Sequence, residues 1–322
     1  MTAAMTSPTS AAISPKLVYV LTTNCRDPYA DMVLVSMLSV GLSNPEITTV
    51  LVVDTISMEA LTASNHKLLE ISDSVIAIDT PPGSGVFRSR WMKTQVGHFI
   101  QGAVIFIDAD TIVRRAIDWP RHFNSGFGAV ADAPYVEASE DPHRLQVSVD
   151  IGWNQDRTYY NSGFFYYVSS PAMERFFETW HSLWQDNRDR TNNKDQPSFN
   201  AAITLAAFDE QELPETFNHQ ITMSWKDCQR SKVWHFWESS RMPGDILDEL
   251  TRQSADLPIG QLTEKVRLAI SKNTPAAYSN RQARALEFLS IDPELQRKLL
   301  IQKSRLSTTE FLRWSLRKLV GR

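Results

Sequence analysis

The sequence predicts an α/β protein with a doubly wound, mostly parallel sheet, followed by a helical C-terminal part. Between Lys16 and Phe208, short runs rich in Val and Ile alternate with segments whose apolar residues have helical spacing. Alternating β and α segments are typical of parallel strands joined by crossover helices. After Asp245 the strand signals stop and the pattern becomes helical.

The expected elements follow one another in a regular order. The six β-type runs are the predicted strands, at 17–21, 49–53, 75–78, 104–107, 128–131 and 164–168. The predicted helices cover 30–42, 58–70, 88–101, 171–184 and 195–207. Ser170 and Pro171 suit the N-cap and first position of the fourth helix. Right-handed crossovers would bring the loops after Leu21, Val53 and Ile107 to one rim of the sheet, where such sheets bind ligands.

The chain of 322 residues is long enough for a large core, and we divide it into three parts. Residues 1–15 are small, polar and uncharged, which predicts a disordered leader. This segment lacks the pattern of a secretory signal. Residues 16–244 form the predicted α/β domain, and 245–322 the helical region. A net charge of −4 offers no electrostatic support for nucleic-acid binding.

Cysteine usage and hydropathy indicate a cytoplasmic location. Cys25 and Cys228 are far apart and lack metal-type spacing, so a reducing compartment is the simpler interpretation. No apolar run approaches the roughly 20 residues needed to span a bilayer. The end of the chain, 297–322, carries eight basic residues against Glu310 alone, interleaved with apolar residues such as Trp314. It could lie on an anionic membrane surface as a peripheral contact, or pack on its own domain.

Two acids follow the fourth predicted strand. The apolar run 103–107 ends in Asp108 and Asp110, separated by Ala109. Carboxylates at the C-terminal edge of a buried strand suit Mg²⁺ or Mn²⁺, and a metal there indicates a phosphate-bearing substrate. The alternative is that both acids only form a turn after the strand.

Further short motifs occur in a fixed order around these acids. They are Thr22-Thr23-Asn24 after the first strand, Arg90 and Lys93 on the third helix, Asn161-Ser162-Gly163 before a strand, and Asp195-Gln196 at a helix start. With Asp108-Ala109-Asp110, they make the chain resemble glycosyltransferases of the GT-A fold, most closely the retaining enzymes of family 8, over about 17–236. The resemblance implies Mn²⁺- or Mg²⁺-dependent transfer of a hexose from a nucleotide-diphosphate sugar, a UDP-sugar, to a hydroxyl on a glycan or other acceptor.

Several polar residues are candidates for binding this donor. Arg90 and Lys93 are three residues apart, so they share a helix face and could contact phosphate or sugar oxygens. The alternative is two solvated helix charges. The side chains at 22–24 could hydrogen-bond to the base or ribose, although turns favour the same residue types. Asp54, after the second strand, is a similar rim residue.

Two later motifs are candidates for positions beside the sugar. Gly163 would let the backbone approach the sugar closely, and Asn161 and Ser162 could contact the donor, the alternative being a strand-entry turn. The resemblance implies that Gln196 faces the anomeric carbon and that Asp195 binds donor hydroxyls. A simple N-terminal helix cap is the other interpretation of this acid.

The resemblance also implies a late histidine as the third metal ligand, and His235 is the candidate, with His219 second. Imidazole ligates Mn²⁺-class ions beside carboxylates, although an aromatic-flanked histidine is often an ordinary packed residue. The family pattern continues with a glycine and Lys-Pro-Trp, whereas Trp-Glu-Ser-Ser-Arg follows here. Arg241 could supply the missing cation.

Two other functions remain open at this stage. The altered segment after His235 is compatible with a non-catalytic protein that binds a nucleotide sugar or glycan. A sugar nucleotidyltransferase is disfavoured, because the loop 22–29 contains no glycine. No strong carboxylate nucleophile emerges from the sequence, which favours front-side attack over a covalent intermediate.

Overall fold

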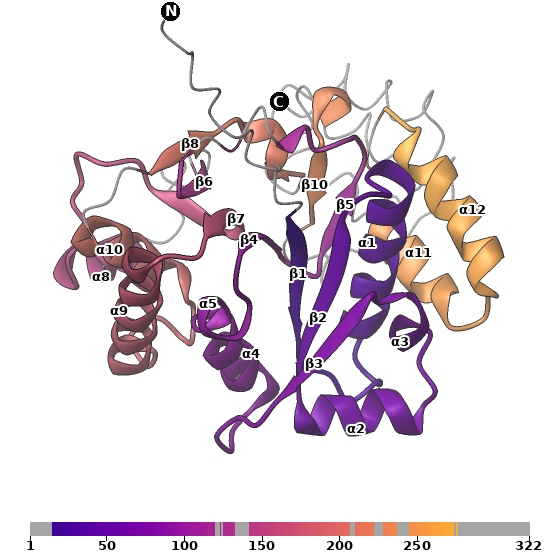
Figure 1. The fold of residues 1–322 in the computed structure, drawn as a ribbon, viewed down its shortest axis with the longest axis horizontal. Coiled ribbons are helices and arrows are strands. Elements are labelled where there is room, and N and C mark those ends of the chain that lie inside the picture. The colour runs from indigo at the N-terminus through magenta and orange to yellow at the C-terminus, as the bar shows by residue number, and fades with distance from the viewer. Residues whose placement is uncertain are drawn as a thin grey trace, which may run out of the picture.

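A computed structural model describes residues 15–119, 123, 125–132, 142–206, 210–221, 228–236, 245–273 and 275. The strands of its main sheet are β1 (Lys16–Leu21), β2 (Thr48–Asp54), β3 (Ser74–Ile78), β4 (Ala103–Ile107), β6 (Phe127–Ala131), β7 (Tyr160–Val168) and β8 (Gln211–Leu213). They lie in the order β3-β2-β1-β4-β7-β6-β8 (Figure 1).

The sheet is mixed and mostly parallel, as the sequence predicts. β1 pairs in parallel with β2 and β4, and β2 with β3, so the carboxyl ends of these four strands share one edge. β7 runs antiparallel to β4 and β6. Because of this reversal, the beginning of β7 lies beside the end of β4, and the Asp108 N–H donates to Gly163 O at 2.9 Å.

Helices cover both faces of the sheet (Figure 1). They are α1 (Tyr29–Ser43), α2 (Thr55–Ala63), α3 (Leu68–Ile71), α4 (Gly85–Lys93), α5 (Val96–Phe99), α8 (Pro142–Asp150), α9 (Pro171–Asn187), α10 (Gln196–Ala206), α11 (Ile246–Ser254) and α12 (Ile259–Ile270). Along β1, Leu17, Tyr19 and Leu21 pack into one core cluster, whereas Val18 and Val20 pack into the other. This alternation explains why the strand reads as a continuous apolar run.

Three predicted boundaries are wrong. The helix expected at 58–70 is split into α2 and α3, with Asn65 between them at a left-handed φ of 48°. The helix at 88–101 begins earlier, at a cap in which Ser84 accepts from the Phe87 N–H, and is divided into α4 and α5. Asn161-Ser162-Gly163 lies inside β7 rather than before it, because the pairing with β6 resumes at Val130 and Asn161 after a register shift.

A second sheet was not predicted. Its strands are β5 (Thr111–Val113), β9 (His219–Gln220) and β10 (Val233–His235), in the order β5-β10-β9. Strands this short show no periodicity in the sequence. β10 runs antiparallel to β5 and pairs His235 with Thr111, so it brings residue 235 next to the two acids. Helix α8 was also not predicted.

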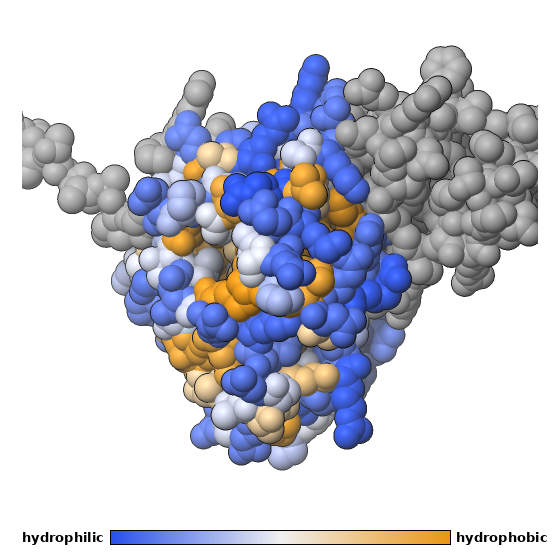
Figure 2. Space-filling model, turned by 90° about the vertical axis from the view of Figure 1, so that its right-hand side faces the viewer, coloured by the Kyte–Doolittle hydropathy of each residue, from blue (hydrophilic) through white to orange (hydrophobic). Residues whose placement is uncertain are grey.

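The described part of the C-terminal region is helical and packs on α1 through α11 and α12. The Asp245 carboxylate caps α11 by accepting from the Asp248 N–H at 2.8 Å. Figure 2 shows this side of the molecule, where hydrophilic residues surround scattered apolar ones. The boundary at 244 stays a prediction. The leader up to residue 14 and the basic end 297–322 lie outside the described residues. Among the helices that the structure describes, none is long and apolar enough to cross a membrane.

His181 on α9 makes stability depend on pH. Burial, with a smaller repulsion from His98, lowers the pKa of its ring to about 4. The unfolded ring titrates near 6.5, so between pH 6.5 and 4 the unfolded state binds a proton that the native state does not. The free energy of unfolding therefore decreases as the pH is lowered through this range.

Between pH 7 and 5 we therefore expect the wild type to lose about 1 kcal/mol more free energy of unfolding than His181→Gln, a value reduced because the ring is only half buried. Urea unfolding at both pH values measures this difference. Equal losses in the two proteins would contradict the assignment.

Candidate functional site

Asp108, Asp110 and His235 form a cluster at the carboxyl end of β4. His235 Nε2 lies 3.3 Å from Asp110 Oδ1 and 4.0 Å from Asp108 Oδ2. One potential ligand atom from each residue lies within 4.8 Å of the others. His219 is buried on β9 and is not part of this cluster. The structure thus brings together the three residues predicted as metal ligands.

Asp110 and His235 each shift the pKa of the other. Burial would raise the pKa of Asp110, but the His235 imidazole outweighs burial and lowers it. Burial would lower the pKa of His235, but Asp110 and then Asp108 outweigh burial and raise it. The cluster therefore attracts positive charge, which either a proton on the ring or a metal ion can supply.

The donor set fits a divalent cation. Two carboxylates and an imidazole are suitable ligands for Mn²⁺-class ions, and the carboxylates also suit Mg²⁺. The side chains of Asp108 and Asp110 are about a quarter exposed, at 24 and 25%, whereas that of His235 is buried. A cation held here would therefore be reached from the side of the acids.

Gly163 allows this cluster to assemble. A Cβ added at this position would lie 2.6 Å from His235 Cε1, 2.8 Å from Asp108 Oδ2 and 2.9 Å from Asn161 Oδ1. The sequence predicted that glycine here lets the backbone approach a sugar. In the structure, the missing side chain gives room to two candidate metal ligands.

Replacing Gly163 by Ala is expected to displace His235 and Asp108 and to weaken Mn²⁺ binding by at least about tenfold, a typical cost when the support of a metal ligand is disturbed. Titration calorimetry with Mn²⁺ measures this change. Gly126→Ala is the control, because a Cβ at residue 126 meets no atom within 4 Å. Equal Mn²⁺ affinity in both variants would contradict the role given to Gly163.

Lys93 links the cluster to a second acid. Its side chain is 2% exposed, and Nζ lies 3.1 Å from Asp108 Oδ1, 3.2 Å from Asp195 Oδ2 and 3.3 Å from Ser162 Oγ. Arg90 Nε lies 2.9 Å from Asp195 Oδ1. Burial would raise the pKa of Asp195, but Lys93 and Arg90 outweigh burial and hold it well below its usual range. Five residues predicted from four separate motifs are thus in contact, and a solvated Lys93 is excluded.

Asp132, which the sequence analysis missed, organises the remaining predicted residues. It is buried directly after β6 and accepts hydrogen bonds from Gln196 Nε2 at 2.6 Å, Asn161 Nδ2 at 3.3 Å and Gln220 Nε2. Burial raises the pKa of Asp132, although these amide donors oppose the rise. Gln196 Oε1 in turn accepts from the Ser162 N–H at 3.4 Å. The sequence signal that could have identified Asp132 was its position directly after the strand expected at 128–131.

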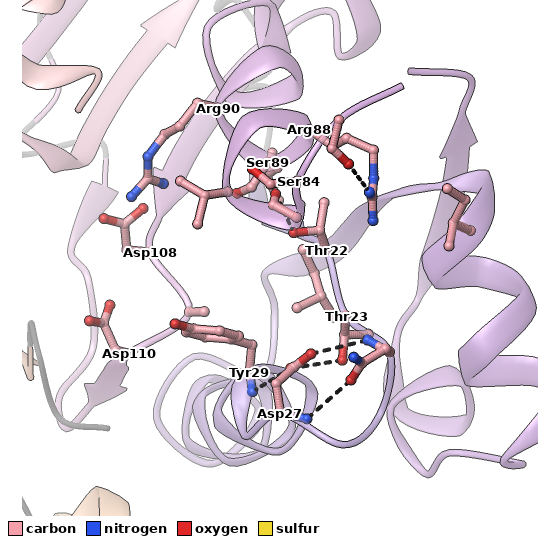
Figure 3. A pocket seen from close by; sticks show the side chains of 18 residues that line it. Thr22, Thr23, Asp27, Tyr29, Ser84, Arg88, Ser89, Arg90, Asp108 and Asp110 are labelled. Carbon is pink, nitrogen blue, oxygen red and sulfur yellow. Dashed lines mark hydrogen bonds between the residues drawn. The ribbon is translucent and has the colours of Figure 1, made fainter. Parts of the chain in front are cut away.

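A cavity of about 580 Å³ opens at the carboxyl edge of β1 and β4 (Figure 3). Seven predicted residues line it, namely Thr22, Thr23, Asn24, Arg90, Asp108, Ala109 and Asp110. The wall also contains three exposed apolar or aromatic side chains that were not predicted, Tyr29, Ile56 and Val86. A cavity of this size with polar groups at one end suits a nucleotide-sized ligand.

The predicted rim residue Asp54 does not line this cavity. It is fully buried, and its carboxylate caps α2 by accepting from the Ser57 N–H at 2.9 Å. The same carboxylate also accepts from Arg88 Nε. Thr22 and Thr23 are partly occupied by turn contacts, since Thr22 Oγ1 donates to Gly85 O at 2.8 Å and Thr23 Oγ1 to Asp27 at 2.9 Å.

Solved glycosyltransferases have a similar architecture. An active-site mutant of LgtC matches at 16% identity with a TM-score of 0.52, covering 84% of this chain and 99% of that one. This match shows the fold. The chain has a GT-A fold, as its sequence predicts. Apo mouse xyloside xylosyltransferase 1 matches at 16% identity, TM-score 0.45, over 69% of this chain and 97% of that one. GlyE of Streptococcus pneumoniae matches at 11%, TM-score 0.47, over 83% and 67%. No protein-family model and no curated protein sequence matches the chain.

Proposed function

We propose that this GT-A protein is a metal-dependent glycosyltransferase that moves a hexose from a nucleotide-diphosphate sugar, a UDP-sugar, to an acceptor hydroxyl with retention. The observation that carries the proposal is the cluster of Asp108, Asp110 and His235 at one end of a nucleotide-sized cavity. A cation site at the C-terminal edge of an open α/β sheet is suited to a ligand with phosphate groups.

Asp108, Asp110 and His235 would hold Mn²⁺ or Mg²⁺, which when bound neutralises charge on the departing nucleoside diphosphate. Arg90 lies at the same end of the cavity, beside Asp108 (Figure 3). Its guanidinium can donate to phosphate or sugar oxygens while Asp195 holds Nε in place. These side chains position the donor before the sugar is transferred.

The buried acids support front-side attack. Asp195 is neutralised by Lys93 and Arg90, and Asp132 accepts three amide N–H groups, so neither carboxylate is presented as a free nucleophile. The amide of Gln196, held by Asp132, is the group that we place beside the anomeric carbon. The proton of the acceptor hydroxyl would then pass to an oxygen of the leaving phosphate.

A screen of UDP-, GDP- and ADP-hexoses for hydrolysis tests the proposal. We expect release of nucleoside diphosphate from at least one donor with Mn²⁺ and none with EDTA. Release of pyrophosphate would indicate nucleotidyl transfer instead. Mn²⁺-dependent thermal stabilisation by a nucleotide sugar without turnover would indicate a non-catalytic binding protein.

We also propose a cytoplasmic protein that contacts membranes peripherally through its basic C-terminal end. The support is the composition of 297–322, where cationic and apolar residues interleave. Flotation with anionic liposomes tests this, by comparing the full chain with one that ends at Ser304. Equal partitioning of the two chains would contradict membrane contact.

A further inference from the structure

Arg88 is a second arginine in the cavity, fixed in place by two contacts. Its Nε donates to the buried Asp54 carboxylate, and Nη1 donates to Gly83 O at 2.6 Å. The side chain is 14% exposed and that of Asp54 is 1% exposed. Both residues are held by the fold, because Asp54 also caps α2. The plane of the Arg88 guanidinium is therefore preset rather than free to follow a ligand.

The two arginines lie at different ends of the cavity. Figure 3 shows Arg90 beside Asp108 on one side, and Arg88 with Thr22 and Thr23 on the other. If the acids mark the place of the diphosphate, as the proposed function requires, the nucleoside extends away from them. Arg88 then lies at the end that receives the base (Figure 3).

The chemistry of Arg88 suits hydrogen-bond recognition better than phosphate binding. Its charge is already neutralised by Asp54, so its long-range attraction for an anion is small. A guanidinium has five N–H donors and no acceptor, and two of these donors are used by Asp54 and Gly83. Within the described part of the chain, the remaining N–H groups of Arg88 have no hydrogen-bond partner. They can only be matched by an acceptor.

We propose that the Asp54–Arg88 pair makes the donor site select a base with a carbonyl oxygen at C4 of a pyrimidine or C6 of a purine, as in uracil and guanine, against a base with an amino group at that position, as in cytosine and adenine. This assignment rests on the proposed function and names the class of nucleotide for that site. A carbonyl oxygen accepts from the Arg88 N–H groups. An amino group at the same place puts donor against donor, and leaves both unpaired when water is excluded.

Two matched pairs of probes test the selection: UDP against CDP, and inosine diphosphate against ADP. Within each pair, the ring size and the diphosphate are the same; the carbonyl at C4 or C6 is replaced by an amino group, and the adjacent ring N–H becomes an acceptor nitrogen. With Mn²⁺ present, we expect the wild type to bind the carbonyl member of at least one pair about tenfold more tightly, a usual size for base discrimination by one arginine. Titration calorimetry gives the ratio of the two Kd values.

The double variant Asp54→Asn/Arg88→Gln removes both charges and keeps an amide oxygen that can cap α2. We expect its Kd ratio to fall within about threefold of unity, with Mn²⁺-dependent binding retained. Arg88→Lys keeps the charge beside Asp54 but loses the planar fork, so its ratio should fall by about threefold or more. The control is Asp248→Asn/Arg252→Gln, an ion pair on α11 with a distance of 2.8 Å, in which Arg252 is exposed and Asp248 is partly buried; it should keep the wild-type ratio.

A wild type that binds both members of each pair equally would overturn the assignment. The assignment would also be overturned if folded variants at position 88 kept the wild-type ratio of Kd values. Either result leaves the glycosyltransferase proposal in place. Failure of every diphosphate to bind with Mn²⁺ would instead overturn the proposed function, and this assignment with it.

Discussion

Replacing Asp108 and Asp110 together by Ala is expected to lower Mn²⁺-dependent sugar transfer by at least about a thousandfold. The substitution leaves His235 alone in the cluster, too few ligands to hold a divalent cation. Loss of charge neutralisation on the departing diphosphate costs several kcal/mol of transition-state stabilisation, and each 1.36 kcal/mol is about tenfold in rate. Initial rates with the best donor, with and without Mn²⁺, measure the effect.

The double variant should remain folded. Each of the two carboxylates is partly exposed, and without a metal ion they repel one another. We expect the urea midpoint to fall only moderately, because Lys93 keeps its ion pair with Asp195 when Asp108 is removed, and the thermal stabilisation by Mn²⁺ to disappear. Asp186→Ala/Asp189→Ala is the control, since these two acids lie in the exposed region at the end of α9. Full transfer activity without residues 108 and 110 would refute the metal site.

The main sheet could be predicted because its signals are local. Apolar runs such as 104–107 are long enough to indicate buried strands, and their order implies parallel pairing. The three-residue spacing of Arg90 and Lys93 predicted that they share a helix face, and on α4 both side chains contact Asp195. Asp108 and Asp110 stood out because they end a strand.

The rest of the site depends on contacts between distant segments. His235 reaches the acids through β5 and β10, three residues each, whose pairing has no local pattern. Asp132 and Gln220 are 88 residues apart and meet only in the folded chain. Asp54 looked like a rim residue, yet Arg88 from α4 pairs with it and it lies buried. Sequence spacing within one element says nothing about such pairs.

Replacing Lys93 by Met is expected to reduce the free energy of unfolding by about 3–5 kcal/mol. Removing one member of a buried ion pair leaves the other charges without compensation, and this costs more than the pair contributes when intact. Here the loss exposes Asp195 and Asp108 to one another at the centre of the site, with Arg90 as the remaining cation on Asp195. Urea unfolding measures the change.

Lys265→Met is the control for this experiment, because residue 265 is exposed on α12 and its loss should change stability little. A second variant separates charge from packing. Adding Asp195→Asn to Lys93→Met removes the uncompensated carboxylate, so the pair of substitutions should be less destabilising than the sum of the single ones by about 1–3 kcal/mol. Simple additivity would show that Lys93 contributes through its packed methylene chain. A non-additive result would show that the positive charge of Lys93 is required, because this charge lets Asp108 and Asp195 lie close together in a buried setting.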